Sequence, residues 1–314
     1  MFRCSLLVLA LASVVNLAAQ TATATLQGLV RDPSGAAVPD ATVAVKNVRT
    51  GVPNTTRTNV QGRYVVPFLQ PGDYEIAVDK IGFRRFVQSS IKLDVQQNLS
   101  LDVQLLLGDV ATAVEVTAAP PPLATSTSTL TTTIGNQAVA DLPLNGRQVL
   151  QLSLTVPAVY AAGGAAGQSG VGTGGLTMYS PAIGGGRGMT SEVMVDGAPL
   201  SVSDPTGGAR AMGGQPPSVD AVEEFSVQTN ALAAEYGRIG GGVINIATKQ
   251  GTNQFHGTAR EFLRNSKMDS NDFFSNRAGV PLSSFKRNQY GFSAGGPVFL
   301  PRVHDGRNRT FFFV

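Results

Sequence analysis

Short stretches in which every second residue is apolar recur along this chain, and they restrict it to a mainly β structure. In YEIAV (residues 74–78) and LSLDVQL (residues 99–105) the apolar residues alternate with others, which is the period of a half-buried strand. Turn-forming residues such as Pro71-Gly72-Asp73 separate these stretches. Roughly seven such strands in the ~85 residues from 24 to 108 predict a small β-sandwich.

The first residues have the organisation of a secretory signal peptide. Arg3 precedes an apolar run of about fifteen residues, and the small residues that follow would allow cleavage after Ala19 or Gln20. A membrane anchor is the alternative, but the run is shorter than the ~20 residues of a spanning helix. We therefore expect residues 1–20 to direct export. The single cysteine, Cys4, lies among them, so we expect no thiol chemistry in the mature chain.

Composition argues against two classes of function. The net charge is only +3 and no run of Lys or Arg stands out, so the sequence does not predict a nucleic-acid partner. The two histidines, His256 and His304, lie far apart, and no nucleophile–base pair or cluster of metal ligands can be named. None of the glycines completes a phosphate-binding motif. We predict a chain that is not an enzyme and that carries no cofactor or metal.

Residues 109–133 read as a linker, because Ala, Thr, Ser and Pro dominate them. One short segment within the linker alternates between apolar and polar residues, and it could add as a strand to the sheet edge of a partner. The alternative is a last strand of the sandwich or plain linker, which the pattern alone favours. The segment consists of Thr112, Ala113, Val114, Glu115, Val116, Thr117 and Ala118.

Residues 134–250 mix several kinds of element and predict an α+β domain. NQAVADLPLNGRQVLQLSLTVPAV indicates one or two short helices interrupted at Pro143, and Asp196-Gly197 indicates the turn of a hairpin. The stretch 161–188 is so rich in glycine that we expect a flexible loop or a segment threaded through tight space. The domain ends in the apolar strand VINIATK, which follows three glycines.

Residues 251–314 hold ten of the fifteen phenylalanines and contain strands of a different character. In QYGFSAGGPVF, Tyr290 and Phe292 fall on one face, whereas Gln289 and Ser293 fall on the other. Aromatic residues outside and small or polar residues inside are typical of a strand in an outer-membrane barrel, although a soluble sandwich gives the same pattern. FHGTAREFLRN and RTFFFV are further candidate strands.

Two of these segments resemble known protein families. GLVRDPSGAAVPDATVAV, TNVQGRYVVPFLQPGDYEIAV and KIGF resemble the carboxypeptidase regulatory-like domain, which implies a transthyretin-like β-sandwich with an accessory role and no protease site. LPLNGR, GGGRGMTSEVMVDG and PSVDAVEEFSVQTNALAAEYGRIGGGVINIATKQGTNQFHG resemble the plug domain of TonB-dependent outer-membrane transporters. A regulatory-like domain ahead of a plug resembles the Oar-like branch of that family.

The second resemblance implies an order of domains. Together with the signal sequence and the first resemblance, it gives a signal peptide at 1–20, the sandwich at 24–108, a linker at 109–133, the plug at 134–250 and the first barrel strands at 251–314. VINIATK would be the last plug strand, buried on both faces among the plug helices, and FHGTAREFLRN would be the first wall strand. The three glycines, Gly240 to Gly242, would let the backbone pass close to its neighbours.

The same resemblance implies a location and partners. The chain would lie in the outer membrane, with its N-terminal domain in the periplasm. Its partners would be a TonB-type energy-coupling protein, outer-membrane lipid, and an extracellular ligand, for which an oligosaccharide or a peptide is considered. The segment 112–118 would be the TonB-box-like site that the energy-coupling protein binds.

Two alternatives remain at this point. A closed barrel of this class needs ~22 strands, so we expect the chain to be the N-terminal part of a longer receptor. The competing function is a secreted or surface module that binds carbohydrate or protein through the sandwich, without transport. Charged residues of residues 134–250 are expected in turns, helix caps, plug–wall ion pairs or on the solvated surface. These residues are Arg187, Asp196, Glu223, Glu224, Glu235 and Arg238.

Overall fold

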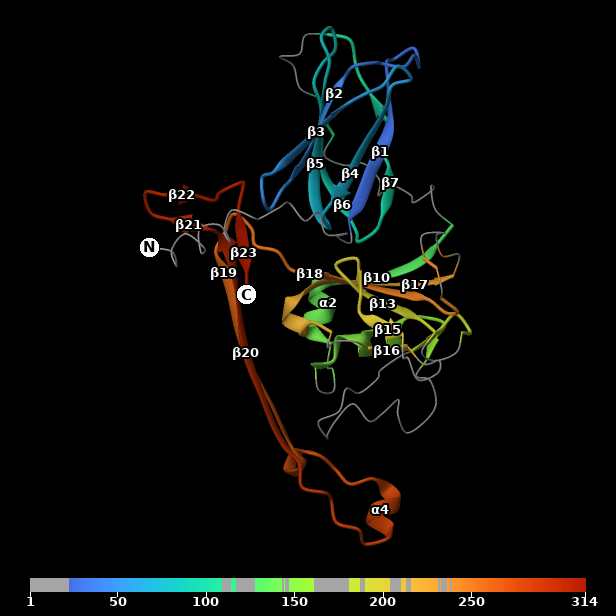
Figure 1. Ribbon diagram of the computed structural model, residues 1–314, viewed down its shortest axis with the longest axis vertical. Helices are drawn as coiled ribbons and strands as arrows, with labels where there is room; N and C mark the ends of the chain where they lie inside the picture. The colour runs from blue at the N-terminus through green and yellow to red at the C-terminus, as the bar shows by residue number, and fades with distance from the viewer. Residues whose placement is uncertain are drawn as a thin grey trace, which may run out of the picture. The chain divides into compact units, whose positions relative to one another are not determined.

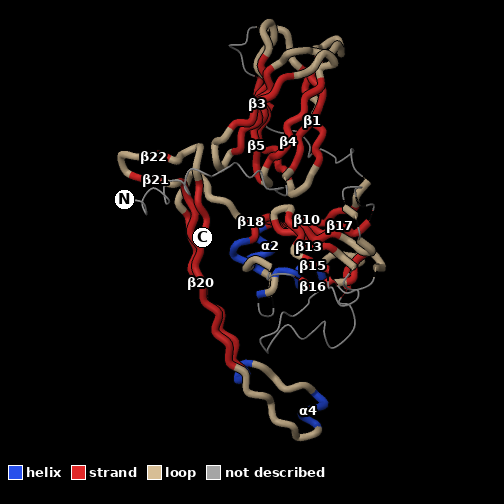
Figure 2. The backbone as a smooth tube through the Cα atoms, viewed as in Figure 1, coloured by secondary structure: helices blue, strands red, loops and turns tan. Residues whose placement is uncertain are grey.

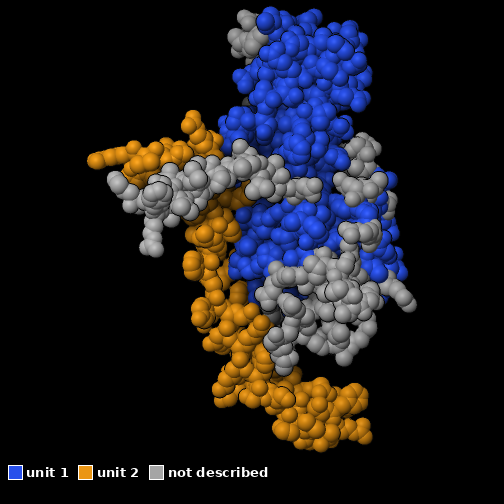
Figure 3. All heavy atoms as spheres, in the orientation of Figure 1, with its two compact units in different colours: residues 1–249 blue, residues 250–314 orange. Residues whose placement is uncertain are grey.

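The protein divides into two compact units, residues 1–249 and residues 250–314, in a computed structural model (Figure 3). The structure describes residues 23–108, 114–116, 128–142, 144, 147–160, 181–186, 190–203, 210–212, 216–230, 232, 236–237 and 239–314. The predicted signal peptide lies outside these residues. Strands are the main secondary structure of the described chain (Figure 2), as predicted. No helix in this part of the chain is long and apolar enough to cross a membrane.

The chain begins with a β-sandwich of two sheets (Figure 1). One sheet has the order β4-β1-β7, with β8 also paired to β1, and the other has the order β3-β2-β5-β6-β9. Its strands are β1 (Ala24–Arg31), β2 (Thr42–Asn47), β3 (Pro53–Arg57), β4 (Arg63–Leu69), β5 (Gly72–Asp79), β6 (Phe86–Leu93), β7 (Asn98–Ser100), β8 (Val103–Gln104) and β9 (Val114–Val116).

Alternating apolar residues produce the core of this sandwich. In β1 every second residue from Ala24 to Val30 is buried, and these side chains pack against the buried faces of β2 and β5. The Tyr64 hydroxyl is buried with them and donates a hydrogen bond of 2.7 Å to the Leu101 carbonyl. The predicted sandwich is confirmed. Strand β3 was not expected, because its sequence, PNTTR, is polar and it lies mostly exposed at a sheet edge.

The central domain, which we define as the described residues from 128 to 249, is built on a five-stranded sheet with the order β10-β17-β18-β13-β14. Neighbouring strands in this sheet are antiparallel, except for β13 and β18, which run parallel to each other. Its elements are β10 (Leu130–Gly135), α2 (Asn136–Asp141), η2 (Val149–Thr155), β11 (Val159–Tyr160), β12 (Ala182–Ile183), β13 (Glu192–Val195), β14 (Ala198–Pro199), β15 (Ser201–Ser203), β16 (Arg210–Met212), η3 (Val219–Ala221), β17 (Val222–Asn230) and β18 (Val243–Thr248).

Helical segments cover one face of the central sheet. Phe225 and Val227 of β17 and Ile244 and Ile246 of β18 share a core with residues of α2 and η2. The two helices expected around Pro143 are present, although the second, η2, is a 3-10 helix. The hairpin expected at Asp196-Gly197 is also present, with positive φ at both residues, as a type I′ turn requires.

Strand β18 is buried on both faces, as predicted. Val243, Asn245 and Ala247 lie on the face opposite Ile244 and Ile246, and all five side chains are buried. Helices were expected to cover both faces. The structure differs on the second face, where Val95 and Gln96 of the sandwich contact Ala247 and Asn245.

The three glycines before β18 do allow close approach. A Cβ atom on Gly242 would collide with the Ile183 side chain and with the Gln228 carbonyl, and one on Gly241 would lie 2.7 Å from Ser191 Oγ. Real Cβ atoms do not approach other heavy atoms this closely, so glycine is the residue that fits the backbone at both positions. The sequence prediction for this seam is confirmed at these two positions.

The second unit is dominated by a long hairpin. Strands β19 and β20 pair in an antiparallel register from His256↔Gly295 to Asn265↔Lys286, and β23 pairs with the end of β20. The elements are β19 (His256–Asn265), η4 (Ser266–Met268), α4 (Phe273–Arg277), β20 (Lys286–Pro297), β21 (Phe299–Leu300), β22 (His304–Asp305) and β23 (Phe311–Phe313).

The two faces of this hairpin differ in character, and the register assigns each residue to a face. One face carries Leu263, Tyr290 and Phe292, of which Tyr290 and Phe292 are 86% and 78% exposed, together with the polar or charged residues Glu261, Asn265, Lys286 and Asn288. The other face carries the polar or charged residues Thr258, Arg260, Arg264, Arg287, Gln289 and Ser293, interrupted by Phe262. The division predicted within β20 holds for residues 289–293, whereas in β19 Glu261 lies on the face with the aromatic residues and Phe262 lies on the opposite face.

Candidate functional site

The turn that follows β6 connects the sandwich to the central domain. Residues Asp94 to Gln97 form a tight turn, because the Asp94 N–H donates to Gln97 Oε1 (2.8 Å) and the Gln97 N–H donates to the Asp94 carbonyl (3.1 Å). Gln96 adopts a positive φ of 57° at its tip. This turn presents Val95 and Gln96 to the polar face of the central sheet, and Val95 is buried against Ala247.

Gln96 is the centre of a buried hydrogen-bond network. Its Oε1 atom accepts hydrogen bonds from the Tyr236 hydroxyl (2.6 Å), from Gln228 Nε2 (3.3 Å) and from Asn245 Nδ2. Asn245 and the neighbouring Ser226 are fully buried. A buried polar network of this kind is stable only while its members keep their partners, so the position of the turn is specified by this face.

Glu224 is the titratable group of this junction. Its side chain is 5% exposed, and its Oε1 atom accepts a hydrogen bond of 2.7 Å from the Val95 backbone N–H. Burial raises the pKa of the Glu224 carboxyl to about 7, because a charged group loses its hydration there. The negative charges of Asp94 and Glu223 add to this, whereas the Val95 N–H and the Lys92 ammonium oppose it.

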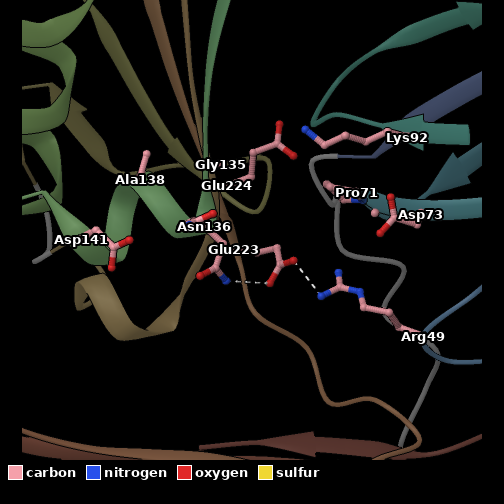
Figure 4. Close-up of a pocket in the computed structure, with 12 residues that line it drawn as sticks. Arg49, Pro71, Asp73, Lys92, Gly135, Asn136, Ala138, Asp141, Glu223 and Glu224 are labelled. Carbon is pink, nitrogen blue, oxygen red and sulfur yellow. Dashed lines mark hydrogen bonds and ion pairs between the residues drawn. The ribbon is translucent and has the colours of Figure 1, made fainter. Parts of the chain in front are cut away.

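A cavity of about 640 Å³ lies beside this carboxyl and is lined by both parts of the first unit. Figure 4 shows Arg49 and Lys92 of the sandwich pointing toward Glu223 and Glu224 of β17. Arg49 forms an ion pair with Glu223 at 2.8 Å. Both side chains are partly exposed, so this pair adds little to stability, roughly 0–1 kcal/mol.

The chemistry of this junction suits contact between domains rather than catalysis. The cavity brings two cationic side chains together with four carboxyls, and an ion pair between the two domains here joins Arg49 and Glu223. Among the described residues no group of His, Cys, Asp or Glu is arranged to hold a metal ion. The site therefore holds the sandwich against the central sheet through one turn, one buried carboxyl and one ion pair.

The predicted TonB-box-like segment is placed only in part. Val114–Val116 forms strand β9, which runs parallel to β6 at the edge of the sandwich. Thr112, Ala113, Thr117 and Ala118 lie outside the described residues. The structure therefore brings the middle of this segment to the same strand, β6, whose following turn makes the junction.

Sequence analysis missed the junction and assigned its carboxylates differently. Asp196 does support a turn, since it accepts hydrogen bonds from the Thr248 N–H and hydroxyl. The interpretation of Glu224 as solvated surface is wrong, because the side chain is buried. Glu224, Ser226 and Gln228 recur at every second position in VEEFSVQ, which was the available signal for a covered polar face. Arg187, Glu235 and Arg238 lie outside the described residues.

Comparison with known proteins indicates the class of protein to which this chain is similar. Residues 25–106 match the carboxypeptidase regulatory-like domain, and residues 247–314 match the outer membrane beta barrel domain. The TonB-dependent transporter Oar of Myxococcus xanthus is 27% identical over 256 residues, which cover 79% of this chain. The probable TonB-dependent siderophore receptor PirA of Acinetobacter baumannii is 38% identical over 107 residues, or 31% of this chain. The chain spans 23% of the length of the first relative and 14% of the second.

Solved structures align with this chain only in part. The crystal structure of the siderophore receptor PirA from Acinetobacter baumannii aligns with a TM-score of 0.39 at 26% identity, over 54% of this chain and 22% of that one. The sequence matches make this chain a homologue of TonB-dependent outer-membrane receptors, as the resemblance predicted. They also confirm the outer membrane as its location. The relatives are transporters and receptors rather than enzymes, in agreement with the prediction.

Proposed function

We propose that this chain is the N-terminal part of a TonB-dependent outer-membrane receptor that binds an extracellular ligand and imports it with energy from the inner membrane. The observation that supports this function is the order of regions along one chain. A regulatory-like sandwich comes first, a mixed sheet covered by short helices comes next, and a two-faced hairpin that matches a barrel family comes last.

Each region then has a role. Residues 1–20 direct export, and residues 24–108 form a periplasmic domain. The linker, residues 109–133, carries the coupling segment, residues 134–250 form the plug, and residues 251–314 begin the barrel wall. Strand β20 supports the last assignment, because its face with Tyr290 and Phe292 suits lipid and its face with Gln289 and Ser293 suits a polar interior.

The coupling segment, which we define as residues 112–118, is assigned to the energy-coupling protein. It lies between the sandwich and the central domain, where a pull on the chain would act on the plug. The backbone of Val114–Val116 already adopts the strand conformation and pairs with a sheet edge. An extended backbone that can pair with a sheet edge is what binding by strand addition requires.

The ligand is assigned only by class. One relative is named a siderophore receptor, which favours a siderophore over the oligosaccharide or peptide considered from the sequence. Outer-membrane lipid surrounds the barrel wall. The alternative function, a secreted or surface sandwich that binds carbohydrate or protein, leaves the barrel match at 247–314 unexplained.

A proline substitution tests the coupling assignment. Proline lacks the N–H that a strand donates to its neighbour, so we expect Val116→Pro to abolish binding of the C-terminal domain of the host's TonB-type protein. The matched control is Ala119→Pro, which places a proline just outside the segment and beside Pro120. Binding would be measured on the intact receptor in outer-membrane fractions. Undiminished binding by Val116→Pro would remove the segment from the coupling role.

A further inference from the structure

Strand β9 occupies the edge of the sandwich in a defined register. Phe86, Val87 and Gln88 of β6 pair in parallel with Val114, Glu115 and Val116. This places β9 last in the sheet order β3-β2-β5-β6-β9, and in the described part of the chain no strand pairs with its outer edge. The middle of the proposed coupling segment is therefore held by the same protein that is expected to present it.

The sandwich also delivers the chain to this edge. The Arg84 N–H donates to the Leu106 carbonyl (2.8 Å), and the Gly108 N–H donates to the Gly82 carbonyl (3.2 Å). Leu107 is bridged to Phe83 between these contacts. Gly108 is thereby fixed beside the residues that precede β6. Only a short stretch separates it from Val114, so closing the loop onto β6 costs little entropy.

The pairing between β6 and β9 is short enough for another strand to replace it. The net contribution of each hydrogen bond to stability is similar to the entropy lost in ordering one residue, so a three-residue strand is close to balance. The main factor that favours β9 is that it belongs to the same chain as β6, which raises its effective concentration there. A partner that pairs with more of residues 112–118 would therefore displace the internal contact.

We propose that the edge of β6 is a strand-binding site that holds the coupling segment in cis and competes with the energy-coupling protein for it. This inference rests on the proposed function. The sandwich then sets how often the segment is free, and the apparent affinity of the partner falls by the fraction of time that the segment spends on β6. In the opposing arrangement the partner adds to the outer edge of β9 and leaves the β6 contact in place.

A disulfide tests both the site and the competition. Val87→Cys with Glu115→Cys places thiols at a register pair, where adjacent strands are close enough for a disulfide. Val87→Cys with Val116→Cys is the matched control, because a one-residue offset turns Cβ atoms to opposite faces of a sheet. Both pairs would be introduced into the intact receptor with Cys4 replaced by Ser. The probe is the C-terminal domain of the host's TonB-type protein.

We expect the register pair to oxidise and the offset pair to remain reduced. The oxidised register pair should bind the probe at least roughly tenfold more weakly than wild type, and reductant should restore binding. If the register pair does not oxidise, β6 does not hold the segment and the inference fails. If it oxidises and binding is unchanged, the partner adds to β9 and the competition fails. If the reduced protein and the wild type both fail to bind, the coupling function fails, while the oxidation result still decides whether β6 holds the segment.

Discussion

Glu224 makes the contact between the sandwich and the central domain sensitive to pH. Its carboxyl is buried beside Asp94 and Glu223, with the Lys92 ammonium as an opposing charge, and its pKa rises to about 7 from an ordinary value of 4.5. The folded junction therefore binds this proton more tightly than the unfolded chain does. The stability that this protonated carboxyl contributes to the junction is complete below pH 4.5 and is lost as the pH rises through about 7.

Glu224→Gln should remove this dependence. Glutamine keeps an oxygen that can accept the Val95 hydrogen bond but carries no charge. Between pH 5 and pH 8 the wild-type junction should lose up to roughly 3 kcal/mol relative to the variant. Native-state hydrogen exchange at the Val95 amide would measure this. Glu223→Gln removes the ion pair with Arg49 and only the smallest of the causes that raise the pKa of Glu224, so it should keep most of the dependence. Parallel pH profiles for wild type and Glu224→Gln would contradict the assignment.

The environment of Glu224 shows what the sequence could not supply. The alternation of Glu224, Ser226 and Gln228 opposite Phe225 and Val227 indicated a two-faced strand. What covers the polar face is a backbone N–H from a residue 129 positions earlier. A contact between such distant segments depends on how two domains dock, and no local period records it.

At the level of elements, local pattern was sufficient wherever one face of a strand is buried. Strand β1 follows the expected alternation, and so do the buried residues Tyr74, Ile76 and Val78 of β5, because burial on one side imposes a period of two. Strand β3 escaped notice because an exposed edge strand has no such constraint. The 3-10 form of η2 was also missed, since helix and 3-10 turn share most sequence signals.

The glycine seam before β18 gives a prediction for this element. Gly242→Ala would place a methyl group against Ile183 and the Gln228 carbonyl, so β17 and β18 would have to separate. We expect a loss of about 1–3 kcal/mol in stability of the central sheet. The control is Gly135→Ala in the same domain, where nothing lies within 4 Å of the added atom. Faster hydrogen exchange in β17 and β18 of the Gly242 variant only would confirm the close approach, and equal exchange would refute it.

The β19–β20 hairpin gives a second prediction at this scale. Phe292→Arg puts a charge on the face proposed to meet lipid, whereas Gln289→Arg puts the same charge on the opposite face. On the lipid face the cost should be roughly 2–4 kcal/mol near the bilayer midplane. We expect less of the Phe292 variant in outer-membrane fractions and wild-type amounts of the Gln289 variant. Equal amounts of both would argue against the assignment of the faces.

Within the first unit, strand β6 contacts both β9 and, through the turn that follows it, the central sheet. β6 pairs with β9 along its edge, and the turn after β6 carries Val95 and Gln96 into the central sheet. Movement of β6 would therefore disturb both contacts at once. A strand that binds the coupling segment on one side and the proposed plug at its end is a physical route by which each could influence the other.

The junction should also make the sandwich and central domain unfold together. In wild type, the Gln96 network, the Val95 hydrogen bond and the Arg49–Glu223 pair join them. Gln96→Ala with Glu223→Ala leaves buried donors on Tyr236 and Asn245 without this acceptor and removes the ion pair, so the interface should weaken by several kcal/mol.

We therefore expect amides of β1 and β18 to exchange with similar opening energies in wild type and with separate energies in the double variant. Gln61→Ala, an exposed glutamine of the sandwich, is the matched control and should leave both unchanged. If β1 and β18 already open independently in wild type, the junction holds two separately stable domains. β6 could then carry no coupling between the segment and the central sheet, because loss of one contact would leave the other unaffected.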